Sequence, residues 1–122
     1  MKLITDKENI NADEIPKDFT GIAEDKNGDR YWYVKGVLHR EIKPAVIYAN
    51  GTKFWYSEGK VHREDGPAIE YANGTKFWCI KGEIHRKNGT AKEYITGEKC
   101  WSLKDKQYTA TEYQVELAKL SP

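Results

Sequence analysis

The sequence lacks a long apolar segment, both in its interior and near its beginning. No apolar run approaches the roughly 18 residues that identify a transmembrane helix. The opening residues MKLITDKENINADE contain no apolar core of the kind that a secretory signal requires. The sequence therefore predicts neither a membrane span nor a secretory signal, and we expect a cytoplasmic protein.

A dominant charge and the familiar catalytic motifs are also missing. Lys and Arg number 20 and Asp and Glu number 19, which gives a formal net charge of +1. So small a net charge favours neither nucleic acid nor an anionic membrane as a partner. The sequence contains no nucleophile elbow, no phosphate-binding glycine loop and no HExxH motif. We expect a protein that is not an enzyme and that binds no metal and no cofactor.

Cysteine is scarce, since Cys79 and Cys100 are the only two. The repeat described next separates them by about one intervening strand, roughly 10 Å. That separation is beyond the reach of a disulfide bond. We therefore expect both thiols to be reduced.

The sequence does contain an internal repeat of 23 residues. Each repeat, here called a block and numbered first to fourth, is marked by one of Trp32, Trp55, Trp78 and Trp101. The same spacing aligns the pairs His39-Arg40, His62-Arg63 and His85-Arg86. The fourth block is degraded, because Asp105 replaces a repeated glycine and Tyr108-Thr109 replace the His-Arg pair. A worn last repeat is typical of a cap on a repeat array.

Two turn signals in each block predict antiparallel hairpins. Asn73-Gly74 and its equivalents favour a two-residue type I′ turn, which places Tyr71 opposite Lys76 and Ile69 opposite Trp78. This register puts Tyr71 and Phe77 on opposite faces of the sheet. A second turn at Glu58-Gly59 and its equivalents places each tryptophan opposite the histidine of its own block. One such unit cannot bury its own aromatic face, whereas stacked copies can.

These patterns predict a mainly β repeat protein. We expect stacked antiparallel β-hairpins that form a twisted single-layer sheet, with a short C-terminal capping helix. The predicted segments are a polar N-terminal arm at 1–18, a repeat domain at 19–108 made of a half block and four blocks, and a helix at 109–122. Thr109 and Glu112 have capping-box spacing, and Tyr113, Leu117 and Leu120 fall on one helix face.

The aligned histidines do not fit a shared metal site. Zinc holds nitrogen ligands about 2.1 Å away, whereas equivalent residues in successive blocks lie roughly 10 Å apart or more. The favoured interpretation is a structural histidine that packs on tryptophan and bonds to the loop. The alternative is that the row, with His62 and His85, binds a ligand.

The aligned arginines allow two interpretations. Arg40, Arg63 and Arg86 could form a row of forked donors on one rim of the sheet that holds an acidic partner. Alternatively, each arginine stacks on Tyr or Trp of its own block or pairs with local acids. The third block has RKNGT where the second has REDGP, so the C-terminal rim is the more basic.

A column of lysine and arginine alternates with a column of tyrosine, and Lys76 with Tyr71 is one example. Such interleaving could stack bases and hold phosphates. Cross-strand Tyr-Lys pairs are, however, ordinary features of a sheet, and the net charge of +1 gives little attraction for phosphate. We therefore disfavour nucleic acid as a partner.

The stretch HREDGPA at 62–68, together with the glycine-lysine-histidine pattern before it, resembles the MORN-like HREDGPA repeats of small phage and bacterial proteins. The resemblance covers residues 19–108. It implies a single-layer sheet of stacked hairpins that serves as a binding surface without catalysis. A phage origin implies an accessory or counter-defence protein that binds and blocks a host protein in the host cytoplasm.

Three hypotheses for function follow from the sequence. The first is a non-enzymatic module that binds a host or cognate protein, and the second is a binder or sponge for an anionic small ligand such as a nucleotide or lipid head group. The third is a structural protein that self-associates, for example as a homodimer through a sheet edge or face. The candidate partner-binding residues are Arg40, Arg63, Arg86, Trp55, Trp78, Tyr71, Lys76, His62 and His85.

Overall fold

The computed structural model describes residues 2–5 and 15–120, and within them the protein is mainly β, as predicted. The strands are β1 (Lys2–Thr5), β2 (Gly21–Glu24), β3 (Arg30–Val34), β4 (Val37–Leu38), β5 (Val46–Ile47), β6 (Lys53–Phe54), β7 (Tyr56–Ser57), β8 (Lys60–Val61), β9 (Ile69–Glu70), β10 (Lys76–Phe77), β11 (Cys79–Ile80), β12 (Glu83–Ile84), β13 (Lys92–Glu93), β14 (Lys99–Leu103) and β15 (Lys106–Tyr108). The helix is α1 (Ala110–Leu120).

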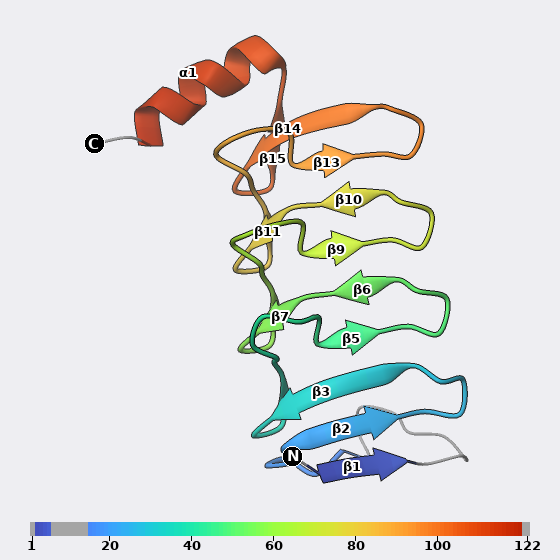
Figure 1. Ribbon diagram of the computed structural model, residues 1–122. Helices are drawn as coiled ribbons and strands as arrows, with labels where there is room; N and C mark the ends of the chain where they lie inside the picture. The colour runs from blue at the N-terminus through green and yellow to red at the C-terminus, as the bar shows by residue number, and fades with distance from the viewer. Residues whose placement is uncertain (1, 6–14, 121–122) are drawn as a thin grey trace.

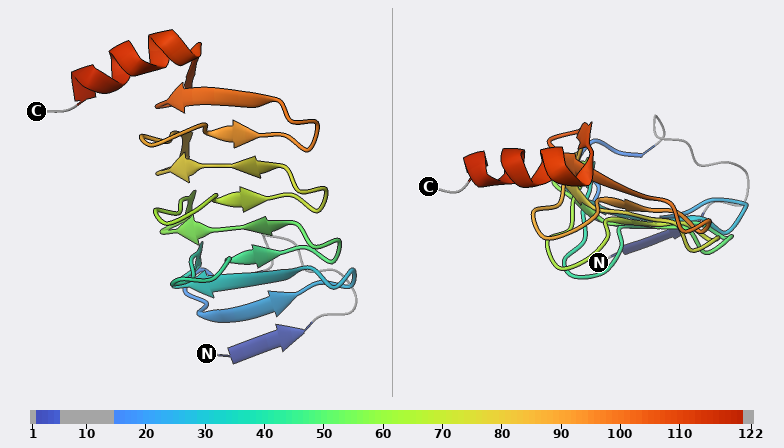
Figure 2. Two further views of the ribbon diagram at one scale, coloured as in Figure 1. Left: turned by 45° about the horizontal axis from the view of Figure 1, so that its top comes forward. Right: turned by 90° about the horizontal axis from the view of Figure 1, so that it is seen from above.

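The predicted stack of hairpins is present, with successive blocks placed side by side (Figure 1). One 11-stranded sheet runs in the order β1-β2-β3-β5-β6-β9-β10-β13-β14-β15, with β4 paired to β3. Two small hairpins, β7-β8 and β11-β12, form sheets of their own. Viewed from above, the hairpins of the main sheet superpose as a thin layer, and the loops at one side turn away from it (Figure 2).

Part of the predicted N-terminal arm joins the sheet. Strand β1 pairs with β2 in parallel, Lys2 with Gly21 through Thr5 with Glu24. Phe19, at the start of the predicted repeat domain, is buried against Tyr33 with ring centroids 6.0 Å apart. The part of the predicted arm at residues 6–14 lies outside the described residues.

The Asn-Gly turns differ from the prediction by one residue. The backbone N–H of Tyr71 donates to the carbonyl of Thr75, and the N–H of Gly74 donates to the carbonyl of Tyr71. Ala72, Asn73 and Gly74 therefore form a three-residue loop, in which Gly74 has a positive φ of 96° and Asn73 does not. This geometry is that of a type I turn followed by a glycine bulge. The side chain of Asn73 stabilises the loop by accepting a bond from the Thr75 N–H.

The extra loop residue shifts the strand register, and the predicted pairing is wrong. Glu70 pairs with Lys76, and Ile69 pairs with Phe77. Tyr71 consequently lies on the same face as Phe77, with ring centroids 5.4 Å apart. Since the side-chain period along a strand is two, a slip of one residue moves side chains to the other face.

The turn at Glu58-Gly59 has the type I′ geometry that was predicted for the Asn-Gly turn. Glu58 and Gly59 both have positive φ, 51° and 83°. The predicted tryptophan-histidine pairing is confirmed, because the His62 N–H donates to the Trp55 carbonyl. In the fourth block Asp105 replaces the glycine and keeps the turn with a φ of 69°.

A buried alanine joins each hairpin to the next. The Trp55 N–H donates to the Ala68 carbonyl, and the Ala68 N–H donates to the Phe77 carbonyl. Ala45, Ala68 and Ala91 are all 0% exposed. Ala68 forms a core cluster with Trp55, Ile69 and Cys79. The small side chain lets neighbouring strands approach around it, which explains why alanine recurs at this position.

Helix α1 begins with the predicted capping box. The Thr109 N–H donates to the Glu112 carboxylate, and the Glu112 N–H donates to the Thr109 hydroxyl. Tyr113 is 2% exposed, and its hydroxyl donates to the Arg86 carbonyl at 2.6 Å. The helix packs on β14 and β15 and covers the loop of the third block.

We predict that Ala68→Leu lowers the free energy of unfolding by about 1 to 3 kcal/mol, because the larger side chain overfills a closed site between strands. Urea unfolding followed by tryptophan fluorescence measures the effect. Ala72→Leu is the matched control, since Ala72 lies exposed in the adjacent turn and its replacement should change stability by less than about 0.5 kcal/mol. Equal destabilisation by the two variants would contradict the packing role of Ala68.

Candidate binding surfaces

Each arginine of the repeat stacks on the tryptophan of its own block. The guanidinium carbon lies 4.0 Å from the ring centroid in all three pairs, which are Arg40 with Trp32, Arg63 with Trp55 and Arg86 with Trp78. The Arg63 side chain also donates to the Pro67 carbonyl at 3.1 Å and to the Asp65 carboxylate at 3.1 Å. These contacts match the alternative interpretation of the arginine row, in which each guanidinium stabilises its own block.

The glycine of the HREDGPA stretch leaves room for this stack. A Cβ atom placed on Gly66 would lie 2.9 Å from the guanidinium carbon of Arg63, which is closer than a real Cβ contact. Gly89 is the equivalent residue of the third block, and a Cβ there would lie 3.1 Å from Arg86. In the first block Lys43 occupies this position and Arg40 still stacks on Trp32, so glycine gives the arginine room in the second and third blocks without being required for the stack.

Each histidine connects its block to the next one. Nδ1 of His62 accepts a hydrogen bond from the Lys81 N–H at 2.9 Å, and His39 and His85 accept equivalent bonds from Glu58 and Lys104. A ring that accepts at Nδ1 is neutral and carries its proton on Nε2. This arrangement agrees with the favoured interpretation of a structural histidine bonded to a loop.

One face of the main sheet carries alternating charges. The paired strands bring Lys53 opposite Glu70, Glu70 opposite Lys76, Lys76 opposite Glu93 and Glu93 opposite Lys99. We call this set, with Glu24 and Arg30 on the N-terminal side of the intervening Ile47, the charge row. Arg63 lies on the same side, since its guanidinium is 3.5 Å from the Glu70 carboxylate. Alternation of sign leaves this face with little net field.

The opposite face carries a continuous row of aromatic rings. Neighbouring ring centroids in this row lie between 5.4 and 6.3 Å apart, and most pairs meet edge to face. We define the aromatic row as Tyr31, Tyr48, Phe54, Tyr71, Phe77 and Tyr94. All six side chains are half-buried. Burial raises the pKa of the Tyr71 hydroxyl, with smaller contributions from Cys79 and Tyr94, so the hydroxyl stays protonated at neutral pH.

The structure separates the predicted partner-binding residues into two groups. Arg40, Arg63 and Arg86 lie with Trp55, Trp78, His62 and His85 in the loops on the side of the charge row, and Lys76 belongs to that row. Tyr71 lies on the opposite face. The sequence-based register did not place Phe54 and Phe77 on the same face as Tyr71, although the phenylalanine and tyrosine positions both recur every 23 residues. The missing information was the length of the loop between them.

Other kinds of site find little support in the described part of the chain. No group of three or more His, Cys, Asp or Glu side chains there lies close enough together to hold a metal ion. No helix there is long and apolar enough to cross a membrane. Cys79 and Cys100 are free and buried. Burial raises the pKa of the Cys79 thiol to about 11, so little of it is thiolate at neutral pH.

Comparison of the chain with protein-family models, with curated proteins and with solved structures gives no match. The interpretation of the two faces therefore rests on their geometry and chemistry.

We predict that Arg63→Met destabilises the fold by about 1 to 3 kcal/mol. The substitution removes the cation stacked on Trp55 and the hydrogen bonds that the charged guanidinium donates. Chemical denaturation of the purified variant measures this loss. Arg30→Met is the control, since the Arg30 side chain is 56% exposed and makes an ion pair with Glu24 worth less than about 1 kcal/mol. If Arg63→Met were as stable as the control, the arginine would not support its block.

We predict that stability falls as the pH is lowered below about 6.5. Burial, together with nearby Lys87 and Lys104, lowers the pKa of His85 below its ordinary value, against a smaller opposing effect of Glu83. The unfolded chain then binds the proton at a pH where the folded chain does not, so the contribution of His85 is complete above its unfolded pKa and is lost as the pH falls through its folded pKa.

Urea unfolding at pH values from 8 to 5 tests this dependence. His85→Asn keeps a side-chain acceptor for the Lys104 N–H and removes the titrating ring, so it should flatten the profile. A variant profile as steep as that of the wild type would assign the pH dependence to other groups.

Proposed function

We propose that the protein is a non-enzymatic protein-interaction module that binds its partner through the aromatic row. The observation that carries this proposal is the asymmetry of the single-layer sheet, with aromatic rings along one face and alternating charges along the other. An antiparallel sheet usually packs its apolar face against a core. Here α1 packs on β14 and β15 at one end, and the small hairpins contribute Val61 and Ile84 to the core, while the rings of the row remain partly exposed.

The chemistry of the row suits a protein partner. Tyr and Phe are enriched at the centres of protein interfaces, where they contribute much apolar area. Contiguous half-exposed rings of this kind commonly mark an interaction site. Lys92 adds one cation to this face, with its ammonium 5.3 Å from the Phe77 ring centroid. A single cation beside six rings gives phosphates little attraction, which favours a protein over a nucleic acid.

The resemblance to MORN-like repeats of phage and bacterial proteins supports the same class of function. For a phage accessory or counter-defence protein, the partner would be a host protein, and docking across the row would block the surface that it covers. The row presents one broad surface for one partner, because the rings of all four blocks are continuous.

Affinity capture from host extract at about 0.15 M salt, followed by binding assays with the purified captured protein, tests the proposal. We predict that Tyr48→Lys with Tyr94→Lys weakens binding at least about tenfold, because each lysine places a charge in an apolar contact. Neither tyrosine packs against the buried core cluster around Ala68, so the fold should survive, and circular dichroism checks it.

The matched control changes the charge row. Lys53→Ser with Lys76→Ser alters two residues of the opposite face and should leave binding within about threefold of the wild type. Stronger effects of the control than of the tyrosine variant would move the interface to the charged face. Sedimentation of the protein alone separates the hypothesis of self-association, because a mass that rises with concentration would make a second copy the partner.

A further inference from the structure

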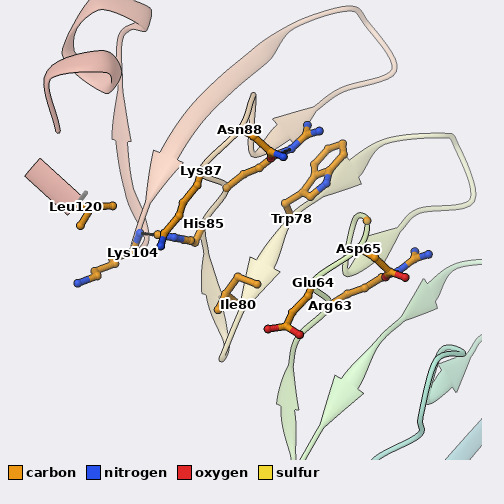
Figure 3. Close-up of a pocket in the computed structure, with 12 residues that line it drawn as sticks. Arg63, Glu64, Asp65, Trp78, Ile80, His85, Lys87, Asn88, Lys104 and Leu120 are labelled. Atoms are coloured by element: carbon orange, nitrogen blue, oxygen red, sulfur yellow. Dashed lines mark hydrogen bonds and ion pairs between the residues drawn. The ribbon is translucent and has the colours of Figure 1, made fainter. Parts of the chain in front are cut away.

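A cavity of about 790 Å³ opens between the loops of the second and third blocks. Its floor is formed by Trp78 and Ile80, and the loops at residues 63–66 and 85–88 form its two walls (Figure 3). Lys104 and Leu120 border it from the fourth block and from the end of α1. The volume lies within the range of sites that hold small organic ligands.

The equivalent space one block earlier is closed. There the indole N–H of Trp55 donates to the carbonyl of Ile42 in the preceding loop, and Trp55 is only 8% exposed. Ile42 turns its backbone to a φ of 72° in this loop. At the open site Asp65 takes the place of Ile42 in the repeat, and the indole N–H of Trp78 makes no hydrogen bond within the described residues. Trp78 therefore remains half-buried and lines the cavity.

The two walls carry opposite charges. Lys87 and Asn88 of the third block stand where the second block has Glu64 and Asp65. In the described part of the chain neither Lys87 nor Lys104 forms an ion pair. Both ammonium groups act electrostatically on His85, which also lines the cavity. One side of the space is therefore cationic and lacks a partner, while the other side offers carboxylates.

The acidic wall remains available as an acceptor. The Asp65 carboxylate accepts one bond from Arg63 at 3.1 Å, but its side chain is 86% exposed. Glu64 is exposed as well. A ligand that fills the cavity thus meets cations at one end, an apolar and aromatic floor below it, and hydrogen-bond acceptors at the other end.

We propose that this cavity binds a small nucleotide, with its phosphate on Lys87 and Lys104 and its base against Ile80 and the side of the Trp78 indole that the Arg86 guanidinium does not cover. The amino group of the base then donates to Glu64 or Asp65. A nucleotide combines the anionic group, the flat apolar ring and the hydrogen-bond donor that the three sides require. An acidic peptide suits the site less well, because Glu64 and Asp65 would repel it.

This site is separate from the aromatic row, so the two proposals can fail independently. The cavity lies among the loops on the side of the charge row, whereas the proposed protein interface lies on the opposite face. A protein with the Tyr48→Lys and Tyr94→Lys substitutions should therefore bind nucleotide as well as the wild type does.

Isothermal titration calorimetry with the four ribonucleoside 5′-monophosphates tests the proposal directly. We expect one site per chain and tighter binding of the amino-bearing bases adenine, cytosine and guanine than of uracil. Lys87→Gln with Lys104→Gln should weaken binding at least about tenfold, because two charge-assisted phosphate contacts are lost. Lys60→Gln with Lys81→Gln removes the same charge from exposed turns outside the cavity and should leave the affinity within about threefold.

A second pair of variants and two further probes complete the test. Glu64→Gln with Asp65→Asn should weaken the preference for the amino-bearing bases, because an amide oxygen is a weaker acceptor than a carboxylate, while phosphate-dependent binding is retained. Inorganic phosphate that binds as tightly as the nucleotides would overturn recognition of the base. A 12-nucleotide single strand that binds more tightly than the monophosphates would replace a small ligand with nucleic acid, and no binding of any monophosphate at about 1 mM would remove the site altogether.

Discussion

The whole arrangement depends on the length of one turn. Ala72, Asn73 and Gly74 form a three-residue loop, and this length fixes Ile69 opposite Phe77 and Glu70 opposite Lys76. The same pair of backbone hydrogen bonds closes the loops at Asn27-Gly28 and Asn50-Gly51 and, with threonine in place of asparagine, the loop at Thr96-Gly97. Every block therefore directs its rings to one face and its charges to the other. The division of the sheet into an aromatic and a charged face is therefore a consequence of turn geometry repeated at a constant period.

Under the proposed function, stability and recognition depend on different groups of residues. Arg63 stacks on Trp55, and His62 bonds to the turn of the next block, so the most conspicuous polar residues of the repeat hold the blocks together. The aromatic row contributes partly to packing and retains exposed area. Repetition alone supplies the fold. The blocks differ locally where Lys87 and Asn88 replace the two acidic residues of the second block, and there an open cavity has a cationic wall.

Much of the fold could be predicted because its determinants are local. The tryptophan interval located the blocks, Glu58-Gly59 located a two-residue turn, and Thr109 with Glu112 located the start of the helix. The Asn-Gly turn was assigned the wrong type because the same dipeptide also suits a type I turn with a glycine bulge. That error assigned Tyr71 to the wrong face, and it concealed the aromatic row even though all six of its members stand in visible columns.

The sequence by itself determined the period and the alanine column, which comparison of the blocks reveals, and the hairpins and the pairing of tryptophan with histidine, which follow from residues within one block. The tertiary structure decided which side chains share a face of the sheet. The face depends on the strand register, and one extra loop residue shifts that register and moves side chains to the opposite face. It also decided that the arginines stack inward and that the loops of the second and third blocks stand apart. The arginine stack is a contact within one block, whereas the placing of the loops arises from contacts between blocks, where residues about 20 positions apart become neighbours.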